Sequence, residues 1–361
     1  MVPSHTLRNI SSAITLWNPL DRSIEANLGS PDGTGKPRAH LAVLLLGDSN
    51  DRYLADAAAT AFGLHAVEPA PLHSICTDLV LSREPQPGTA AARLVKRRGE
   101  PCPLYAGPNL TRPDLVVGMA SIGGTVLHAD TAGWLGSSNE LANNRIATHN
   151  VNTTKPTLDA LDAFTQWVGR PPDLVVLHSA LRDIYRMCRF EALGETEAVA
   201  ADALARRPSL TQAEADQYLR NFGALVRHVE NHLARNPTHA TATLSSLPSH
   251  SSLANRLRGK TVVAMRTLPL VRYSGLVNPC LANGTVVNRL LDDFNRLTRE
   301  AARSLKLPCF DWADWLRGAD PSQYMREPIN GPHVIQPLLA RWFGDMVLQG
   351  RVAASNSHCR P

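Results

Sequence analysis

The chain has 361 residues, 43% of them hydrophobic, with a formal net charge of +5 and an isoelectric point near 9.0. This length can bury a sizeable core, and the basic residues are spread out apart from Lys96–Arg98, so nucleic-acid binding is not indicated. No apolar run approaches the ~18 residues of a membrane span, and the N-terminus lacks the pattern of a signal peptide.

The predicted elements alternate between strands and helices along the chain. Residues 1–39 are polar and rich in Gly and Pro, which favours an extended lead-in. Strands are predicted at Leu41–Leu46, in "DLVVGMAS" from Asp114, in "PDLVVLHSA" from Pro172, in "KTVVAMRTLP" from Lys260 and, more weakly, in "LPCFDWADWL" from Leu307. Two of these strands are apolar at successive positions, which is typical of central parallel strands covered on both faces.

Three amphipathic helices are predicted between and after these strands. The first opens with Ser209 as its N-cap and ends at Asn236–Pro237; its apolar positions are Tyr218, Phe222, Leu225, Val229 and Leu233. The second runs from Asn288, with apolar positions Leu290, Leu291, Phe294, Leu297 and Ala301. The third begins at His333, with Gly350 as its terminator.

Alternating strands and helices predict a three-layer α/β/α sandwich with a central, mostly parallel sheet. We expect a single domain over residues 40–350, with surface insertions near 187–208 and 238–259, and a tail at 351–361. Loops within residues 50–110 and 187–259 would choose the substrate.

The first strand runs directly into Gly47-Asp48-Ser49. In a parallel sheet covered by helices, ligands meet the carboxyl ends of the strands. Gly47 would allow a tight turn, and Ser49 would then stand at the start of a helix, where its own N–H can face an anion. The plainer interpretation is a turn in which Ser49 or Asp48 caps the helix.

Two later segments carry residues that would complete such a site. Gly123 and Gly124 follow the second strand and can bring backbone N–H groups to its end, although an ordinary glycine turn explains them equally well. His333 follows a Pro-Gly turn after the last strand, where a base for a nucleophilic serine belongs. A lone histidine in such a place is more often structural.

Cysteine and sequon patterns bear on the compartment. An even count permits three disulfides, and the absence of a C-x-x-C pair argues against zinc among the six cysteines: Cys76, Cys102, Cys188, Cys280, Cys309 and Cys359. Glycosylation sequons begin at Asn9, Asn109, Asn152 and Asn283. Together these features favour a secreted or lumenal protein. Nothing in the sequence indicates a metal or an organic cofactor.

The strand ending in "GDSN", the glycine-containing "ASIGGT" and the late histidine in "NGPH" together resemble the SGNH (GDSL) hydrolase superfamily. The resemblance spans residues 41–345 in the family's order of motifs. It implies an α/β/α fold, Ser49 as nucleophile and His333 as base. It also implies Gly124, supported by Gly123, as an oxyanion donor.

The chain departs from that family in two places. Asn330 stands where the family carries an aspartate, and an amide cannot stabilise the imidazolium of His333 as a carboxylate does. The expected Gly-x-Asn-Asp is replaced by "LHSALRDIYR" from Leu177. That stretch resembles the PC-esterase (Cas1p- and PMR5-like) branch, whose Ser-x-x-Trp-Asp element matches Ser179 and Asp183, with Arg182 in place of tryptophan. His178 or Ser179 would then supply a polar donor, unless Asp183 merely caps a turn.

The resemblance implies a serine-dependent esterase or O-acyltransferase that acts on ester-linked acyl groups, acetyl above all, of small molecules or glycans. A catalytically weak protein of the same fold that binds a glycan or a protein partner is the alternative. In a third interpretation, the chain is an unrelated α/β protein and the motifs arise by chance. The oligomeric state stays open.

Overall fold

The computed structural model describes residues 41–47, 49–67, 72, 79–86, 89–96, 102–107, 115–121, 154–181, 183–184, 187, 202, 204–235, 261–268 and 284–315. The expected lead-in, the insertion at 238–259, most of the insertion at 187–208, the helix from His333 and the tail lie outside these residues. The domain boundaries predicted from the sequence therefore stay predictions.

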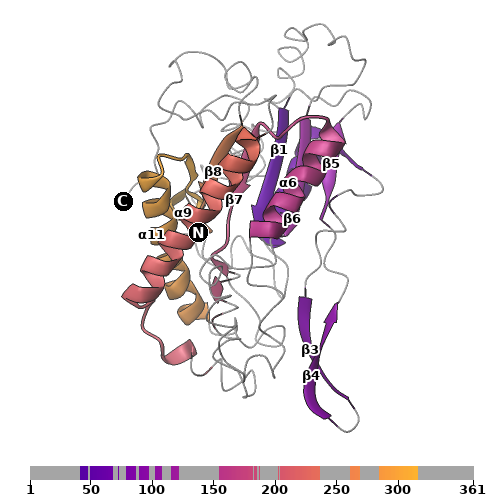
Figure 1. The fold of residues 1–361 in the computed structure, drawn as a ribbon. Coiled ribbons are helices and arrows are strands. Elements are labelled where there is room, and N and C mark those ends of the chain that lie inside the picture. The colour runs from indigo at the N-terminus through magenta and orange to yellow at the C-terminus, as the bar shows by residue number, and fades with distance from the viewer. Residues whose placement is uncertain are drawn as a thin grey trace, which may run out of the picture.

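A seven-stranded, mostly parallel sheet forms the centre of the described structure (Figure 1). Its strands lie in the order β2 (His65–Ala66), β5 (Leu104–Gly107), β6 (Leu115–Ser121), β1 (Leu41–Gly47), β7 (Leu174–Leu177), β8 (Val262–Arg266) and β9 (Cys309–Phe310). From β6 to β9 every neighbouring pair is parallel, whereas β5 runs antiparallel to both β2 and β6. A separate antiparallel pair consists of β3 (Leu79–Gln86) and β4 (Thr89–Lys96). The predicted α/β class is confirmed.

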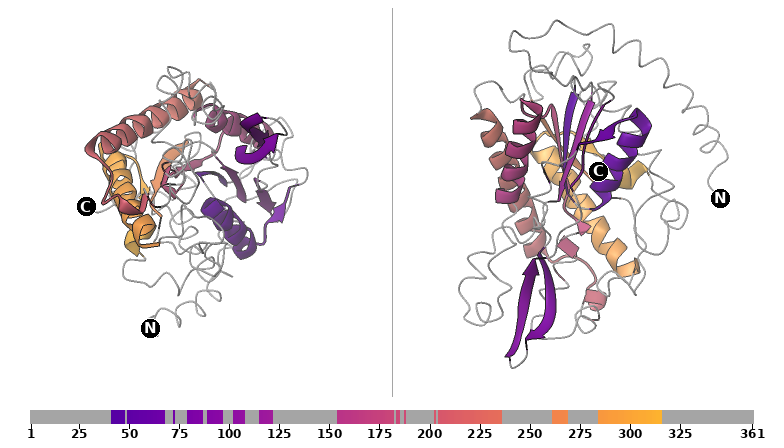
Figure 2. Two further views of the ribbon diagram at one scale, coloured as in Figure 1. Left: turned by 90° about the horizontal axis from the view of Figure 1, so that it is seen from below. Right: turned by 90° about the vertical axis from the view of Figure 1, so that its right-hand side faces the viewer.

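The order of the parallel strands creates one switch point in the sheet. The chain moves from β1 outward to β6, and then returns past β1 to β7 on its other side. Because crossovers between parallel strands are right-handed, the two connecting helices must lie on opposite faces. Figure 2 shows this arrangement for α3 (Ser49–Phe62) and α6 (Thr154–Val168). In such sheets the ligand crevice lies where the winding reverses, here between β1 and β7.

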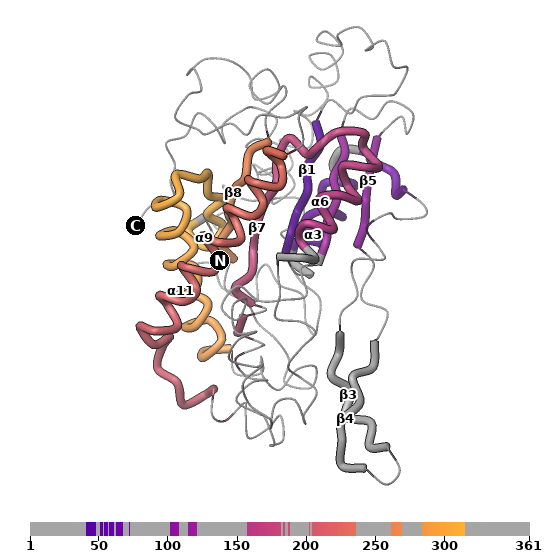
Figure 3. Tube along the Cα trace, viewed as in Figure 1, coloured from indigo at the N-terminus to yellow at the C-terminus, as the bar shows by residue number. Residues whose placement is uncertain are grey.

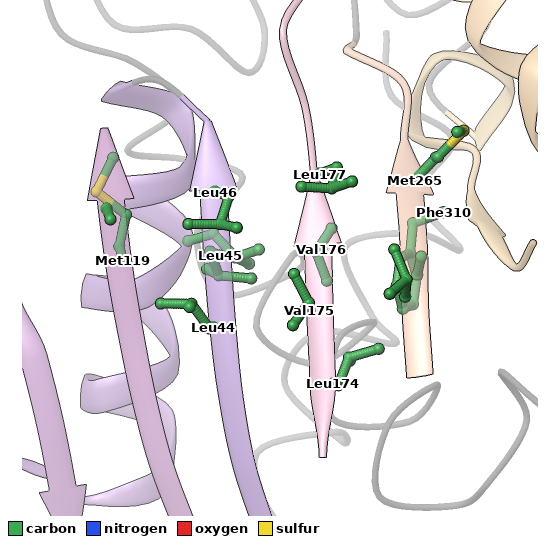
Figure 4. Packing of buried hydrophobic residues seen from close by; sticks show 14 of the residues in the cluster. Leu44, Leu45, Leu46, Met119, Leu174, Val175, Val176, Leu177, Met265 and Phe310 are labelled. Carbon is green, nitrogen blue, oxygen red and sulfur yellow. The ribbon is translucent and has the colours of Figure 1, made fainter. Parts of the chain in front are cut away.

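The core lies between the sheet and these helices. Every residue of β1 is buried, as is every residue of β7 and β8, and burying one leucine side chain contributes roughly 1.5–3 kcal/mol. Figure 4 shows the side chains of Leu44, Leu45 and Leu46 packed beside those of β7. Along the same face as α6 runs α9 (Gln212–Ala234), which contacts α11 (Gly284–Ser304) beside β8.

Tyr218 of α9 joins these two long helices. Its ring stacks on Phe222 with centroids 5.4 Å apart, and meets Phe294 of α11 edge-on at 5.0 Å. All ten apolar positions predicted for the two helices are buried. The periodicity of three and four residues therefore identified their core faces correctly.

The helix boundaries were predicted less well than their faces. Thr211, not Ser209, is the N-cap of α9: its side chain accepts from the Glu214 N–H, and the Glu214 carboxylate accepts from the Thr211 N–H. This reciprocal capping box satisfies two backbone donors, which outweighs what a lone serine upstream offers. Helix α11 begins at Gly284, four residues before the predicted start.

Several elements had no counterpart in the sequence prediction. The helix expected to start at Ser49 is confirmed as α3. The strands β2, β3, β4 and β5, which lie in the stretch where substrate-choosing loops were expected, were not predicted, and neither was α6. The weak fifth strand is confirmed but short, because Cys309–Phe310 runs into the four-residue helix α12 (Trp312–Trp315). Figure 3 follows the Cα trace through β1, β7 and β8, whose carboxyl ends carry the candidate site.

Candidate active site

One row of residues crosses the carboxyl edge of the sheet. Gly47 of β1 pairs with Ser121 of β6. The pairing of β1 with β7 ends at Leu46 and Leu177, and the pairing of β7 with β8 ends at Leu177 and Met265. Figure 4 shows these three residues near the ends of their strands. One position further on, the same register brings Gly47, His178 and Arg266 into one row. The N–H of His178 donates to the carbonyl of Leu46 at 2.9 Å, which extends this register beyond β7.

Ser49 is the first residue of α3 and follows the end of β1 by two positions. The first N–H groups of a helix have no intrahelical acceptor, and the helix dipole places partial positive charge there. The backbone of Ser49 therefore lies where an anion would be stabilised, at the switch point between β1 and β7. The side chain of Ser49 is outside the described residues.

Gly47 is required by space rather than by backbone conformation. The described glycines with positive φ are Gly63 and Gly169, so the tight turn expected at Gly47 does not use the left-handed region. Instead, a Cβ at Gly47 would overlap the carboxylate of Asp51 and lie 3.3 Å from the Cβ of His178. The glycine thus leaves room for the Asp51 carboxylate against the strand end.

Asp51 uses that room to form a fully buried ion pair. Its Oδ1 accepts from Nε of Arg266 at 2.6 Å, and both side chains have zero exposure. The Arg266 guanidinium carbon also lies 4.7 Å from the ring centroid of Trp312, a cation–π contact. The first turn of α3 is thereby connected to the end of β8 and the start of α12.

The end of β7 carries a second buried polar group. Ser179 Oγ donates a hydrogen bond to Oδ2 of Asp183, and both residues are buried. Ala180 between them has φ of +22°, in a region that costs a non-glycine residue energy and that is enriched at functional sites. The structure therefore brings the predicted pair Ser179 and Asp183 together. It also leaves their side chains little access to solvent.

Asp183 acts on α9 as well. Burial raises the pKa of the Tyr218 hydroxyl, and the negative charge of Asp183 raises it further, while a hydrogen bond with Thr298 opposes this. Tyr218 Oη lies 3.2 Å from Thr298 Oγ1. The Tyr218–Thr298 pair connects α9 with α11, and the charge of Asp183 acts on Tyr218 from the end of β7.

The other predicted site residues lie outside the described residues: Asp48, Gly123, Gly124, Asn330 and His333. By sequence, Gly123 and Gly124 follow β6 by two and three positions, and β6 is the neighbour of β1. His333 follows β9 by more than twenty positions. Their roles stay predictions.

Sequence reasoning missed Asp51, Arg266 and Trp312. Asp51 lies four residues after Gly47, and Arg266 is a charged residue that ends an otherwise apolar strand. A charge at the carboxyl end of a buried strand was the available signal. Nothing in the sequence indicated that its partner lies 215 positions away.

Two disulfide-bonded cysteines lie on opposite sides of the sheet. Cys102 and Cys309 are each disulfide-bonded. Cys102 lies two residues before β5, and Cys309 is the first residue of β9. These strands are five strand spacings apart in the sheet, which is about 24 Å. The Cα atoms of a disulfide are only ~4.4–6.8 Å apart. Cys102 and Cys309 are therefore not bonded to each other.

Two further observations concern the described residues alone. No group of three or more His, Cys, Asp or Glu residues gathers there in a way that could hold a metal ion. Among the helices of these segments, none is both long enough and apolar enough to cross a membrane.

Comparison with known proteins gives one distant likeness. No family model and no curated protein matches the chain. A solved structure from Parabacteroides merdae, called a "putative GDSL-like lipase", shares 8% identity at a TM-score of 0.36, over 86% of this chain and 97% of that one. At that TM-score the likeness carries no weight for family or activity. The class that the structure defines is a doubly wound α/β protein with a polar carboxyl edge.

Proposed function

We propose that the protein is a serine-dependent esterase or O-acyltransferase of the SGNH type, and that acetyl esters of sugars are its substrates. One observation carries this proposal. Ser49 opens α3 at the carboxyl end of β1, beside β7, where the winding of the sheet reverses. That is where a doubly wound sheet binds its ligand and where a helix N-terminus favours a developing oxyanion.

In the proposed reaction, Ser49 Oγ attacks the acyl carbonyl while His333 takes its proton. The backbone N–H groups of Ser49 and Gly124 hold the tetrahedral oxyanion. The protonated His333 then gives its proton to the departing alcohol, which leaves an acyl-enzyme. Water or a sugar hydroxyl, deprotonated by His333, attacks that ester and releases Ser49.

The proposal of a glycan substrate rests on two supports. The element Ser179–Asp183, which resembles the PC-esterase branch, forms one hydrogen-bonded unit at the end of β7. The disulfides of Cys102 and Cys309 fit an oxidising compartment, where glycans are abundant. Ser179 and Asp183 are buried, so in this proposal they support the end of β7 and do not contact substrate.

The identity of residue 330 favours a second candidate function. Asn330 replaces the aspartate that orients and stabilises the base, and such a change costs about four orders of magnitude in a serine protease. A weakly active protein of this fold would bind an acylated glycan or a protein partner at the same edge.

A fluorophosphonate probe, which reacts only with an activated serine, distinguishes the two functions. We expect the wild-type protein to be labelled, Ser49→Ala and His333→Ala to lose labelling, and Ser209→Ala, a change at an exposed serine, to keep it. Asn330→Asp should increase the labelling rate by about tenfold or more, because a carboxylate stabilises the imidazolium. A folded wild-type protein that is not labelled would contradict the proposed enzyme and favour binding.

A further inference from the structure

The Asp51–Arg266 pair spans the switch point of the sheet. β7 lies between β1 and β8, and two strand spacings amount to about 10 Å. An arginine and an aspartate side chain together cover that distance. The pair therefore crosses the end of β7 at His178, the residue between Gly47 and Arg266 in the row.

Asp51 and Arg266 each contact further residues besides one another. Asp51 lies against Gly47, where no larger residue fits. Arg266 faces the ring of Trp312, and its Nη1 donates to the carbonyl of Thr267 at 3.4 Å. Thr267 Oγ1 in turn donates to Asp311 and accepts from the N–H of Ala313. The arginine is thus fixed to the segment that joins β9 to α12.

The contacts of Arg266 with Asp51 and Trp312 restrict where the first turn of α3 can lie. Asp51 is the third residue of that helix, and Ser49 is the first. A shift of Asp51 relative to Arg266 would move the Ser49 backbone relative to β7. A shift of ~1 Å in a reacting group can cost about 100-fold in rate.

We propose that Arg266 is a positioning residue that, through Asp51, sets the place of Ser49 at the carboxyl ends of β1 and β7. This inference rests on the proposed function, because it assigns Arg266 a role in the reaction of Ser49. Arg266 itself is fully buried and does not contact substrate.

The test measures fluorophosphonate inactivation of the full chain at several probe concentrations. The final extent of labelling reports the folded fraction, while kinact and KI report the reactivity of Ser49 and the binding of the probe. We expect Arg266→Met to lower kinact by about tenfold or more without raising KI. Arg266→Lys keeps the charge beside Asp51 and should recover part of kinact.

A matched control lies at the other end of the same strands. Arg170 pairs with Asp173 at the start of β7, with two contacts of 2.7 Å. Arg170→Met removes an arginine–aspartate pair at the opposite edge of the sheet and should leave kinact at the wild-type value. If Arg266→Met does not fold, the double variant Asp51→Asn with Arg266→Met leaves no unpaired buried charge and should show the same lowered kinact.

The outcomes separate the inference from the proposed function. A labelled wild type with an unchanged kinact in Arg266→Met, or in the double variant, overturns the positioning role alone. So does an equal loss of kinact in Arg170→Met. A folded wild type that is not labelled overturns the proposed function, and the inference with it.

Discussion

The two edges of the sheet both use an arginine–aspartate pair, and they use it differently. At the amino edge, Asp173 accepts two bonds from Arg170, three residues earlier, and one from the N–H of Ala42 at 2.7 Å. At the carboxyl edge, Asp51 and Arg266 are 215 positions apart and wholly buried. The first pair completes a local turn, whereas the second connects elements that only the fold brings together.

The surroundings of the pairs explain this difference. Asp173 also donates its N–H to Ala42 and accepts from the Val262 N–H, so it joins β1, β7 and β8 through backbone bonds that any residue could make. The missing side chain of Gly47 leaves room for the Asp51 carboxylate, and the ring of Trp312 lies against the Arg266 guanidinium. An edge built on such specific side chains tolerates fewer substitutions.

Removing the arginine of each pair should lower the free energy of unfolding by different amounts. We expect Arg266→Met to lower the free energy of unfolding by about 3–5 kcal/mol, because it removes the positive charge beside the wholly buried carboxylate of Asp51. Arg170→Met should cost only about 1–3 kcal/mol, since Asp173 keeps its bond to Ala42. Urea unfolding at neutral pH measures both values.

A double variant serves as the control for this comparison. Asp51→Asn with Arg266→Met should lose less stability than Arg266→Met alone, because no charge is left unpaired. Equal losses from Arg266→Met and Arg170→Met would mean that the two edges are energetically alike.

The disulfides give a second test of the carboxyl edge. Replacing Cys309 by serine should cost about 2–4 kcal/mol, since the unfolded chain loses a constraint. Non-reducing peptide mapping should show Cys102 and Cys309 in two different bridges, each to one of Cys76, Cys188, Cys280 or Cys359. A direct bridge between Cys102 and Cys309, or alkylation of either in the native protein, would contradict the strand order at this edge.

The capping box of α9, formed by Thr211 and Glu214, tests whether a pair that is local in sequence contributes little to the free energy of unfolding. Burial raises the pKa of Glu214, but hydrogen bonds from the Thr211 N–H and from Arg207 outweigh it, so the pKa is lowered overall. A lowered pKa stabilises the fold above the unfolded pKa of about 4.3, and this contribution is lost as the pH falls through the lower folded value. Glu214→Gln should therefore cost about 0.5–1.5 kcal/mol at pH 7.

The same variant should come closer to wild type in acid, where the Glu214 carboxylate is protonated in both states. Urea unfolding of the two proteins at pH 7 and below the unfolded pKa measures the change. A gap that stays constant with pH would show that the charge of Glu214 contributes nothing.

Local patterns were sufficient for the central parallel strands and for the two longest helices. Continuous apolar runs located β1, β6, β7 and β8, and spacings of three and four located the buried faces of α9 and α11. Hydrophobic periodicity involves residues a few positions apart, so it can be recognised without knowledge of the fold. The short antiparallel strands β2 and β5 carry too few residues for such a pattern.

The candidate site divides in the same way. Gly47-Asp48-Ser49 and the pair Ser179–Asp183 are short motifs, and the sequence by itself determined that a serine follows the first buried strand. Only the tertiary structure decided that β7 lies beside β1, that Gly47 makes room for Asp51, and that Arg266 reaches Asp51 across the end of β7. The physical reason is distance along the chain: a contact over 215 positions depends on strand order and register, which no local pattern encodes.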